Sequence, residues 1–532
     1  MIMQNATATM KSSASIWFGA HAPTTARLML ALLAVLLVLA PLIGAGYHPL
    51  GAMSLQLLAL GILTVALWTP RALPLSRPEM ALLLALPASV LLYAIPLPAA
   101  WVDALAGRDL YTGAAAILPS GGAGAWRPLS LNPTATLEAG FMLLVPIAVF
   151  LGSRLLDTRS LLWLVYLLFG IAAAQALLGL IQYGTGQHGY MLFAVHSAAD
   201  DSAAGTYVNR NHFAGLLEMV FPLVLAMIFA SLAREPDTGP RVGWRRRAAF
   251  LGSERGLRAL AFAAIALLLL LGIIFSKSRM GITMAMLGLV LTSLLFAGRI
   301  GGRHAFGLTG TLVALVLGFG IAIGLVPVLD RFSVDPTADA RSKIFNVTLT
   351  GIGQRLPFGT GPGTLPDAVR ALEPVELGAT FINRAHNDYL EWVSDAGLIA
   401  PVLIALALFL YLRQWTRVYS REQWDSPRFL QAGSGIGLLL LALHELVDYN
   451  LYMPANQTVF ALLAGIFFKS PERPMDGARH RRHHRHASDR DQTVNNPVAP
   501  SAATPARPAS PSPVQIPNPF DDPAPAKPPV TP

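Results

Sequence analysis

The sequence "APVLIALALFLYL" (residues 400–412) directly follows "RAHNDYLEWVSDAGLI" (384–399), so a continuous apolar run begins where a polar segment ends. Runs of about 17 to 25 mainly apolar residues are long enough to cross a bilayer as an α-helix. The whole chain shares this character, because 54% of its 532 residues are hydrophobic, only 13% are charged, and its mean hydropathy is +0.52. Ordinary soluble domains carry about 25% charged residues, so the composition predicts a membrane protein.

About twelve such runs occur along the chain, and they predict an all-α polytopic membrane protein. The expected spans are 28–44, 50–68, 79–96, 137–153, 160–182, 212–232, 258–275, 281–298, 305–326, 397–413, 429–446 and 457–469. The chain then divides into a segment 1–27, a transmembrane domain 28–469 and a tail 470–532. The tail begins basic and His-rich and becomes rich in Pro, Ala and Ser, a composition that predicts disorder.

The arginines in the short connections predict how the spans are oriented. The connection 233–257 holds six arginines, whereas 45–49 and 447–456 contain neither Lys nor Arg. Because cytoplasmic loops are enriched in these residues, we expect 233–257 and both termini to lie in the cytoplasm. The long connections then fall on the outer side of the membrane, namely 97–136, 183–211 and 327–396.

The largest outer loop, 327–396, is expected to do specific work, since long connections in compact proteins are usually functional. It contains a segment with the pattern of an amphipathic helix, "ADARSKIFNVTLTGIG" (338–353), and a Gly/Pro turn, "FGTGPGT" (358–364). Arg384 and His386 lie near its end. We therefore expect the working face of the protein to be the outer one.

His386 is the first candidate for chemistry, because a neutral imidazole can accept a proton from a hydroxyl group near neutral pH. The alternative is an interfacial histidine with a satisfied hydrogen bond. Asn387 and Asp388 are expected in the first turn of a helix, where short polar and acidic side chains are favoured. Tyr389 and Trp392 are then expected to anchor this helix at the level of the lipid headgroups.

Several arginines are expected on the same outer side. Arg210 lies in "YVNRNHFAGLLEM", Arg279 lies in the tight turn "FSKSRMGI", and Arg341 and Arg384 lie in the large loop. Guanidinium groups bind phosphate oxygens through paired hydrogen bonds, so these residues together suit an anionic, lipid-borne diphosphate. The alternative is that each arginine extends to a lipid headgroup.

A further polar pair occurs in "HELVDYNLYMPANQ" (444–457), at the outer end of an expected span. His444 and Asp448 are four residues apart and are expected on one face of a helix. Ionisable groups inside a membrane are candidates for function. A structural hydrogen bond that fixes the outer loops is the alternative.

The sequence gives little support for metal-dependent chemistry, for a P-loop or for nucleic-acid binding. The chain has no cysteine, so disulfides and Cys-ligated metals are excluded. "GTGPGT" lacks the Lys-Ser/Thr of a phosphate-binding P-loop, and no Asp-x-Asp pair that could hold the metal of a nucleotide sugar lies between the expected spans. The net charge of +9 comes largely from short loops and does not indicate nucleic acid. We expect neither metal nor cofactor.

Five segments together resemble the bacterial O-antigen ligase family, which also includes O-antigen and exopolysaccharide polymerases. They are "NRNHFAGLLEM", "SKSRMGI", "RLPFGTGPGT", "AHNDYLEWVSDAGLI" and "HELVDYNLYMPAN". The resemblance covers about residues 140–469, and "WRPLSLNPTATLEA" (126–139) is similar to the polymerase branch. Position 400 is Ala, where the ligase motif has Gly, Thr or Tyr, so both ligase and polymerase stay open.

The resemblance implies a GT-C-like glycosyltransferase of the inner membrane that makes surface polysaccharide. Such enzymes move a glycan from an undecaprenyl-diphosphate carrier to a sugar hydroxyl of a glycan or lipid A-core acceptor. The reaction takes place in the periplasm without a metal. By this resemblance His386 is the general base, and Arg210 and Arg279 bind the diphosphate. The other expected substrate contacts are Arg341, Arg384, Asn387, His444 and Asp448.

Two other functions fit parts of the sequence. A transporter or flippase of lipid-linked sugars would also have many spans, but its ionisable residues should lie at mid-membrane depth in both halves. A scaffold for a polysaccharide assembly complex, with envelope assembly proteins as partners, would use the Pro-rich tail. The clustering of candidate residues at the outer ends of the spans favours the enzyme.

Overall fold

The computed structural model describes most of the chain up to Ser470, and everything below concerns that unit. The described residues are 24–43, 45, 48–70, 73–109, 112–113, 117, 126–186, 202–233, 252–300, 310, 336–375, 381–420 and 424–470. The expected span 305–326 and the tail 471–532 lie outside this set, apart from residue 310.

The described chain is almost entirely helical. The longer helices are α2 (Thr24–Leu42), α3 (Pro49–Trp68), α4 (Arg77–Ala94), α7 (Pro133–Met142), α8 (Leu144–Leu155), α9 (Thr158–Thr185), α10 (Arg210–Leu232), α12 (Glu254–Phe275), α13 (Arg279–Ile300), α16 (Pro336–Arg355), α19 (Ile399–Tyr419), α20 (Ser426–His444) and α21 (Pro454–Phe467). The short helices are α5 (Ala99–Asp103), α17 (Leu365–Val369) and α18 (Asp388–Ala396). Strands β1 (Pro96–Pro98) and β2 (Trp126–Pro128) form a small antiparallel pair.

Within the described residues, nine helical stretches are long and apolar enough to cross a membrane. They are α2, α3, α4, α7 with α8, α9, α10, α12, α13 and α19. α20 carries Arg428 and Gln431 near its start, and α21 is shorter than the others. Every expected span that lies within the described residues coincides with a helix, which confirms a polytopic all-α membrane protein; the number twelve stays a prediction.

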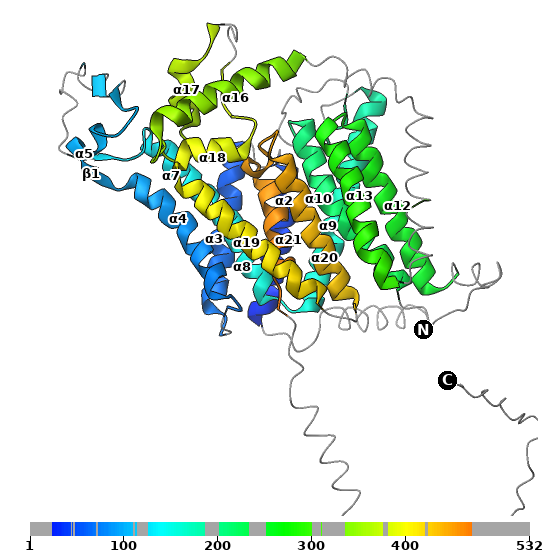
Figure 1. Cartoon of the computed structure of the whole chain (residues 1–532). Coiled ribbons are helices and arrows are strands. Elements are labelled where there is room, and N and C mark those ends of the chain that lie inside the picture. The colour runs from blue at the N-terminus through cyan, green and yellow to red at the C-terminus, as the bar shows by residue number, and fades with distance from the viewer. Residues whose placement is uncertain are drawn as a thin grey trace, which may run out of the picture. The chain divides into compact units, whose positions relative to one another are not determined.

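α10 is the central helix of the bundle, and its apolar stretch is fully buried. It packs against α20, α12 and α13, which surround it in Figure 1. Small residues allow the closest of these contacts. A Cβ atom on Gly437 of α20 would lie 2.4 Å from the Met219 carbonyl oxygen, and one on Gly433 would lie 2.9 Å from that of Pro222. Larger side chains at these two glycines would force α10 and α20 apart.

α16, α17 and α18 lie over one end of the bundle, which we call the α16–α18 end (Figure 1). The amphipathic helix expected over 338–353 is confirmed as α16. Ile344 and Val347 of α16 pack against Leu365 and Val369 of α17 in a small hydrophobic core. The large loop is therefore a folded cap with a core of its own.

The cap joins the bundle through a sharp turn between α18 and α19. Asn387 caps the start of α18, since its Oδ1 accepts a hydrogen bond from the Leu390 amide at 3.0 Å. Gly397 ends α18 with a φ of +52°, and a Cβ atom there would lie 2.1 Å from the Pro357 carbonyl oxygen. Only glycine fits this position, so the junction between loop and span is fixed by Asn387 and Gly397.

Candidate functional site

A cavity of about 1980 Å³ opens between the cap and the bundle. Its polar part lies where the start of α10, the segment before α18 and the loop after α20 meet. The polar side chains that line it include Arg210, His212, Arg341, Arg384, His386 and Tyr449. The cavity therefore collects most of the charged candidates from segments far apart in the sequence.

The rest of the cavity wall is mainly apolar, although Glu79 of α4 and Glu138 of α7 also line it, and much of it is formed by α3, α4, α7 and α19. Typical lining residues are Met53 of α3, Leu86 of α4, Met142 of α7, and Leu403 and Ala407 of α19. These helices are also candidate membrane spans. One continuous cavity thus combines a cationic end with a long apolar wall.

His386 lies in the segment that precedes α18 and lines the polar part of the cavity. Its ring lies 4.9 Å from the ring of Tyr449, measured between centroids. Its φ of +52° is uncommon for a residue with a side chain and is kept only where the surroundings enforce it. Its buried Nδ1 has no hydrogen-bond partner among the described residues. Strained residues of this kind concentrate at functional sites.

The surroundings of His386 favour the neutral imidazole. Burial lowers the pKa of His386 below the ordinary histidine value, and Arg341 and His212 lower it further, whereas Asp448 acts in the opposite direction. A histidine with a lowered pKa is neutral at neutral pH and can accept a proton. His386 therefore has the protonation state that a general base needs.

The residues after His386 are bound to the end of α20. The Asn387 Nδ2 donates to the Leu446 carbonyl at 2.8 Å, the Asp388 amide donates to the Glu445 carbonyl at 3.1 Å, and the Tyr389 hydroxyl donates to the Ala442 carbonyl. Both ends of the Asn387 amide are thus used within the protein, since its Oδ1 caps α18. This residue holds the backbone, and Tyr389 lines the cavity together with Trp392.

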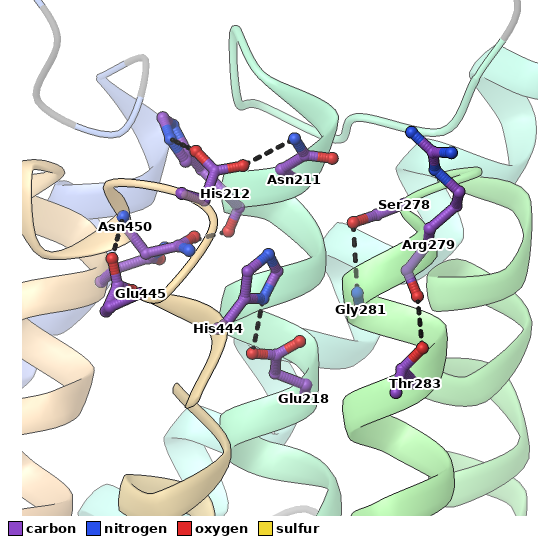
Figure 2. Close-up of polar contacts among 12 residues, drawn as sticks. Asn211, His212, Glu218, Ser278, Arg279, Gly281, Thr283, His444, Glu445 and Asn450 are labelled. Atoms are coloured by element: carbon purple, nitrogen blue, oxygen red, sulfur yellow. Dashed lines mark hydrogen bonds and ion pairs between the residues drawn. The ribbon is translucent and has the colours of Figure 1, made fainter. Parts of the chain in front are cut away.

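Asp448 is 1% exposed and contacts residues of two helices, α10 and α16. Its Oδ2 accepts a hydrogen bond from Asn211 Nδ2 at 2.7 Å and lies 3.9 Å from Arg341 Nη2, and its Oδ1 lies 3.5 Å from His212 Nε2. Figure 2 shows Asn211 and His212 together at the start of α10. Burial alone raises the pKa of Asp448, but the His212 imidazole together with His444 and His386 holds this pKa below its ordinary value. Asp448 therefore supplies a carboxylate close enough to His386 to affect its pKa.

The expectation that His444 and Asp448 share a helix face is wrong. α20 ends at His444, and Asp448 lies in the following loop, where the Asn450 amide donates to Glu445 Oε2 at 2.7 Å and turns the chain. The His444 Nδ1 instead lies 2.9 Å from Oε1 of Glu218 in α10, and both side chains are fully buried (Figure 2). His444 is not among the residues that line the cavity. The two residues therefore have different surroundings.

Three of the four candidate arginines line the cavity, namely Arg210, Arg341 and Arg384. The side chains of Arg341 and Arg384 are 30% and 29% exposed. Arg384 Nη1 lies 2.8 Å from Glu391 Oε1, and its guanidinium carbon lies 3.7 Å from the ring centroid of Tyr452. Guanidinium groups gathered around one cavity form a site for an anion such as a diphosphate.

Arg279 differs from these three arginines. It is the first residue of α13, its carbonyl accepts a hydrogen bond from Thr283 Oγ1 at 2.9 Å, and it is not among the residues that line the cavity. Figure 2 shows its guanidinium at the same end of the bundle but apart from Asn211 and His212. The structure therefore does not bring Arg279 into the cavity with the other candidates.

Several residues at or beside the site were missed by the sequence reasoning. His212 and Tyr449 line the cavity, whereas the buried acids Glu218, Glu391 and Glu445 do not line it but contact His444, Arg384 and Asp388. Glu218 could have been found, because it is the single acidic residue in the expected span 212–232. His212 lies two residues after Arg210 in the segment "NRNHFAGLLEM", but nothing in the sequence pattern distinguished it as a site residue. Within the described ranges no three His, Asp or Glu side chains are arranged to hold a metal ion, and a metal-independent reaction stays a prediction.

The helices and the cavity together define a polytopic membrane protein whose site combines a cationic end with an apolar wall. Residues 264–405 match the family model described as O-antigen ligase. The match confirms the resemblance for the motifs within these residues, which run from α12 into α19 and are similar to the O-antigen ligase family. It supports a ligase-type or polymerase-type role in making surface polysaccharide. A search of curated proteins found no match.

Proposed function

We propose that this protein is an inner-membrane glycosyltransferase that moves a glycan from an undecaprenyl-diphosphate carrier to a sugar hydroxyl in the periplasm. The observation that carries the proposal is the cavity, in which His386, three arginines and a long apolar wall lie together. The O-antigen ligase match over residues 264–405 supports the same chemistry. The acceptor is a growing glycan or a lipid A-core sugar.

The proposed reaction uses His386 as the base and arginines as the diphosphate site. His386 takes the proton of the acceptor hydroxyl, whose oxygen attacks the anomeric carbon while the bond from that carbon to the diphosphate breaks. Negative charge then develops on the leaving diphosphate, and in this proposal Arg210, Arg341 and Arg384, which line the cavity, stabilise it without a metal. We also propose a diphosphate contact for Arg279, on the resemblance alone.

The remaining candidates have supporting roles in this proposal. Asp448 orients Arg341 and His212 around the base. Asn387 fixes the backbone beside His386 through its two hydrogen bonds. His444 acts through its buried pair with Glu218, which holds the start of the loop after α20 close to α10.

The apolar wall is proposed to accept the polyprenyl chain of the carrier. Ala407 of α19 lines the cavity, whereas Ala405 on the same helix does not. The variant Ala407→Trp should fill part of the cavity and raise the KM for the lipid-linked donor about tenfold, the loss expected for about 1.4 kcal/mol. Ala405→Trp is the matched control and should leave the KM unchanged. Equal effects of the two variants would argue against a lipid site here.

The function itself is tested in a strain that lacks the protein. Complementation with the wild-type chain should restore the ladder of bands that surface polysaccharide forms on a gel. His386→Ala should not restore these bands, although the variant should be present in the membrane at the wild-type level. A normal ladder with His386→Ala would exclude the proposal. Lipid-linked intermediates in the strain separate the two branches, because full-length chains on the carrier indicate a ligase and single repeat units indicate a polymerase.

The scaffold alternative is tested by deleting residues 471–532. An enzyme whose chemistry lies in the cavity should keep most of its transfer activity without this tail. A scaffold that uses the tail to recruit assembly proteins should lose the surface polysaccharide completely.

A further inference from the structure

Glu391 is a fully buried acid that the proposed reaction does not use. It lies in α18, and its side chain is 0% exposed. Its Oε1 lies 2.8 Å from Arg384 Nη1, and its Oε2 accepts a hydrogen bond from the Ala385 amide at 2.9 Å. One carboxyl group therefore binds a cavity arginine and the backbone directly before His386.

The contact with Ala385 bears on the conformation of His386. Ala385 is 0% exposed and packs in the small core of the cap, and the next residue has the strained φ of +52°. On the other side the Asp388 amide is bound to the Glu445 carbonyl at 3.1 Å. Hydrogen bonds thus fix the backbone on both sides of the strained His386, and Glu391 accepts the one on the N-terminal side.

The contact with Arg384 bears on the anion site. Glu391 binds one edge of the guanidinium, and the ring of Tyr452 covers one face of it at 3.7 Å. A guanidinium has five N–H donors, so donors remain for the cavity, where the side chain is 29% exposed. The same carboxyl group therefore fixes the direction of Arg384.

We propose that Glu391 is a positioning residue that sets the base His386 and the phosphate-binding Arg384 in one arrangement. The inference rests on the proposed function and goes beyond it, because Glu391 touches neither substrate nor reacting atoms. Its effect is exerted through the hydrogen bonds of its two oxygens. Loss of either bond misplaces a group whose geometry the transfer requires.

The test is Glu391→Gln, assayed in proteoliposomes with lipid-diphosphate-linked glycan extracted from the strain that lacks the protein. A glutamine has nearly the same shape but only one acceptor oxygen, so it can serve Arg384 or Ala385 but not both. The kcat should fall about 100-fold, the loss expected for a displacement of about 1 Å at a catalytic group. Wild-type kcat in Glu391→Gln would overturn the proposal.

Glu373→Gln is the matched control. Glu373 Oε1 accepts a hydrogen bond from the Ile382 amide at 3.2 Å, so it also ties the segment before α18, but this bond lies away from His386 and Arg384. Its kcat should stay close to that of the wild type, because a glutamine keeps the one acceptor oxygen that the Ile382 amide needs. An equal loss in both variants would mean general loosening of the segment and would overturn the positioning role.

A double-mutant cycle with Arg384→Met covers the case in which Glu391→Gln folds poorly. Removing both charges leaves neither charge without its partner, so the double variant should have a higher unfolding temperature than Glu391→Gln alone. Its kcat should be no lower than that of the worse single variant, because the two residues act as a unit. Fully additive losses in kcat would contradict the proposal.

His386→Ala in the same assay separates the two claims. Absence of transfer by the wild-type chain, or normal transfer by His386→Ala, defeats the proposed function. Loss of transfer in His386→Ala together with normal transfer in Glu391→Gln defeats the positioning role alone.

Discussion

Basic side chains lie at both ends of the helix bundle, but only those at one end line the cavity. At the α16–α18 end, Arg210, Arg341 and Arg384 line the cavity. At the opposite end, Arg154 and Arg299 are bound to the protein itself. The composition of the loops alone does not show which of these arginines line a cavity and which bind other parts of the protein.

The opposite end shows how a bundle uses cations for its own structure. Arg299 Nη2 donates to the Tyr419 carbonyl at 3.0 Å, and its guanidinium carbon lies 4.6 Å from the Tyr419 ring and 5.1 Å from the Trp424 ring. Arg154 is 3% exposed, lies 3.9 Å from Glu79 and donates to the Pro74 carbonyl. Cations at this end hold connections together without lining the cavity, whereas Arg341 and Arg384 line the cavity in addition to their ion pairs with Asp448 and Glu391.

The largest effect is expected where a buried pair is broken inside the bundle. His444→Ala leaves Glu218 buried without its partner, and removing one member of such a pair costs about 3 to 5 kcal/mol of unfolding free energy. Thermal unfolding of the purified protein in detergent measures this loss. Glu218→Leu combined with His444→Leu should recover most of it, and a double variant as unstable as the single one would show that the pair is not the cause.

Arg210→Lys tests whether an arginine that lines the cavity contributes more to glycan transfer than an arginine at the opposite end. A lysine cannot reproduce the forked hydrogen bonds of a guanidinium, and loss of one charge-stabilising donor lowers kcat about 100-fold. Arg299→Lys is the matched control and should transfer glycan at the wild-type rate, since Arg299 contacts Tyr419 and Trp424. Similar losses in both variants would remove the distinction between the two ends.

Arg279→Lys tests whether Arg279 belongs to the diphosphate site. The resemblance assigns Arg279 to the diphosphate, but the cavity lining does not include it. We expect about a tenfold loss of kcat, smaller than for Arg210→Lys, because a more distant cation stabilises the leaving group less. A loss equal to that of Arg210→Lys would show that Arg279 enters the site when substrate binds.

The smallest effect is expected in the pH dependence. Because burial lowers the pKa of His386, kcat/KM should be constant around neutral pH and fall only in acid, as the imidazole becomes protonated. Arg341 also lowers this pKa, so Arg341→Met should move the acid limb to higher pH. A shift to lower pH, or a profile without an acid limb, would argue against His386 as the base.

The sequence predicted those parts of the fold that depend on local rules. Apolar runs located the spans, the pattern of 338–353 located α16, and the polar residues after His386 placed the start of α18. Each of these follows from residues within a few turns of one another. The resemblance added that His386 and the arginines belong to one site, and the cavity brings most of them together.

The rest of the site depends on contacts between distant segments. The loop after α20 brings Asp448 to Asn211 of α10, and α10 brings Glu218 to His444. No periodicity in the sequence encodes either pairing. The end of α20 at His444 was missed for the same reason, since the apolar run continues to residue 446 and the loop is fixed by Glu445 and Asn450.

We propose that the cavity at the α16–α18 end transfers glycan, with His386 as the base. The most direct measurement uses purified protein in liposomes with a lipid-diphosphate-linked glycan and an acceptor, and follows both products. The account predicts that the wild-type chain forms glycosylated acceptor and free lipid diphosphate in equal amounts. His386→Ala should form neither, whereas His48→Asn, a histidine change outside the cavity lining, should match the wild type. Transfer by His386→Ala at the wild-type rate would contradict the account.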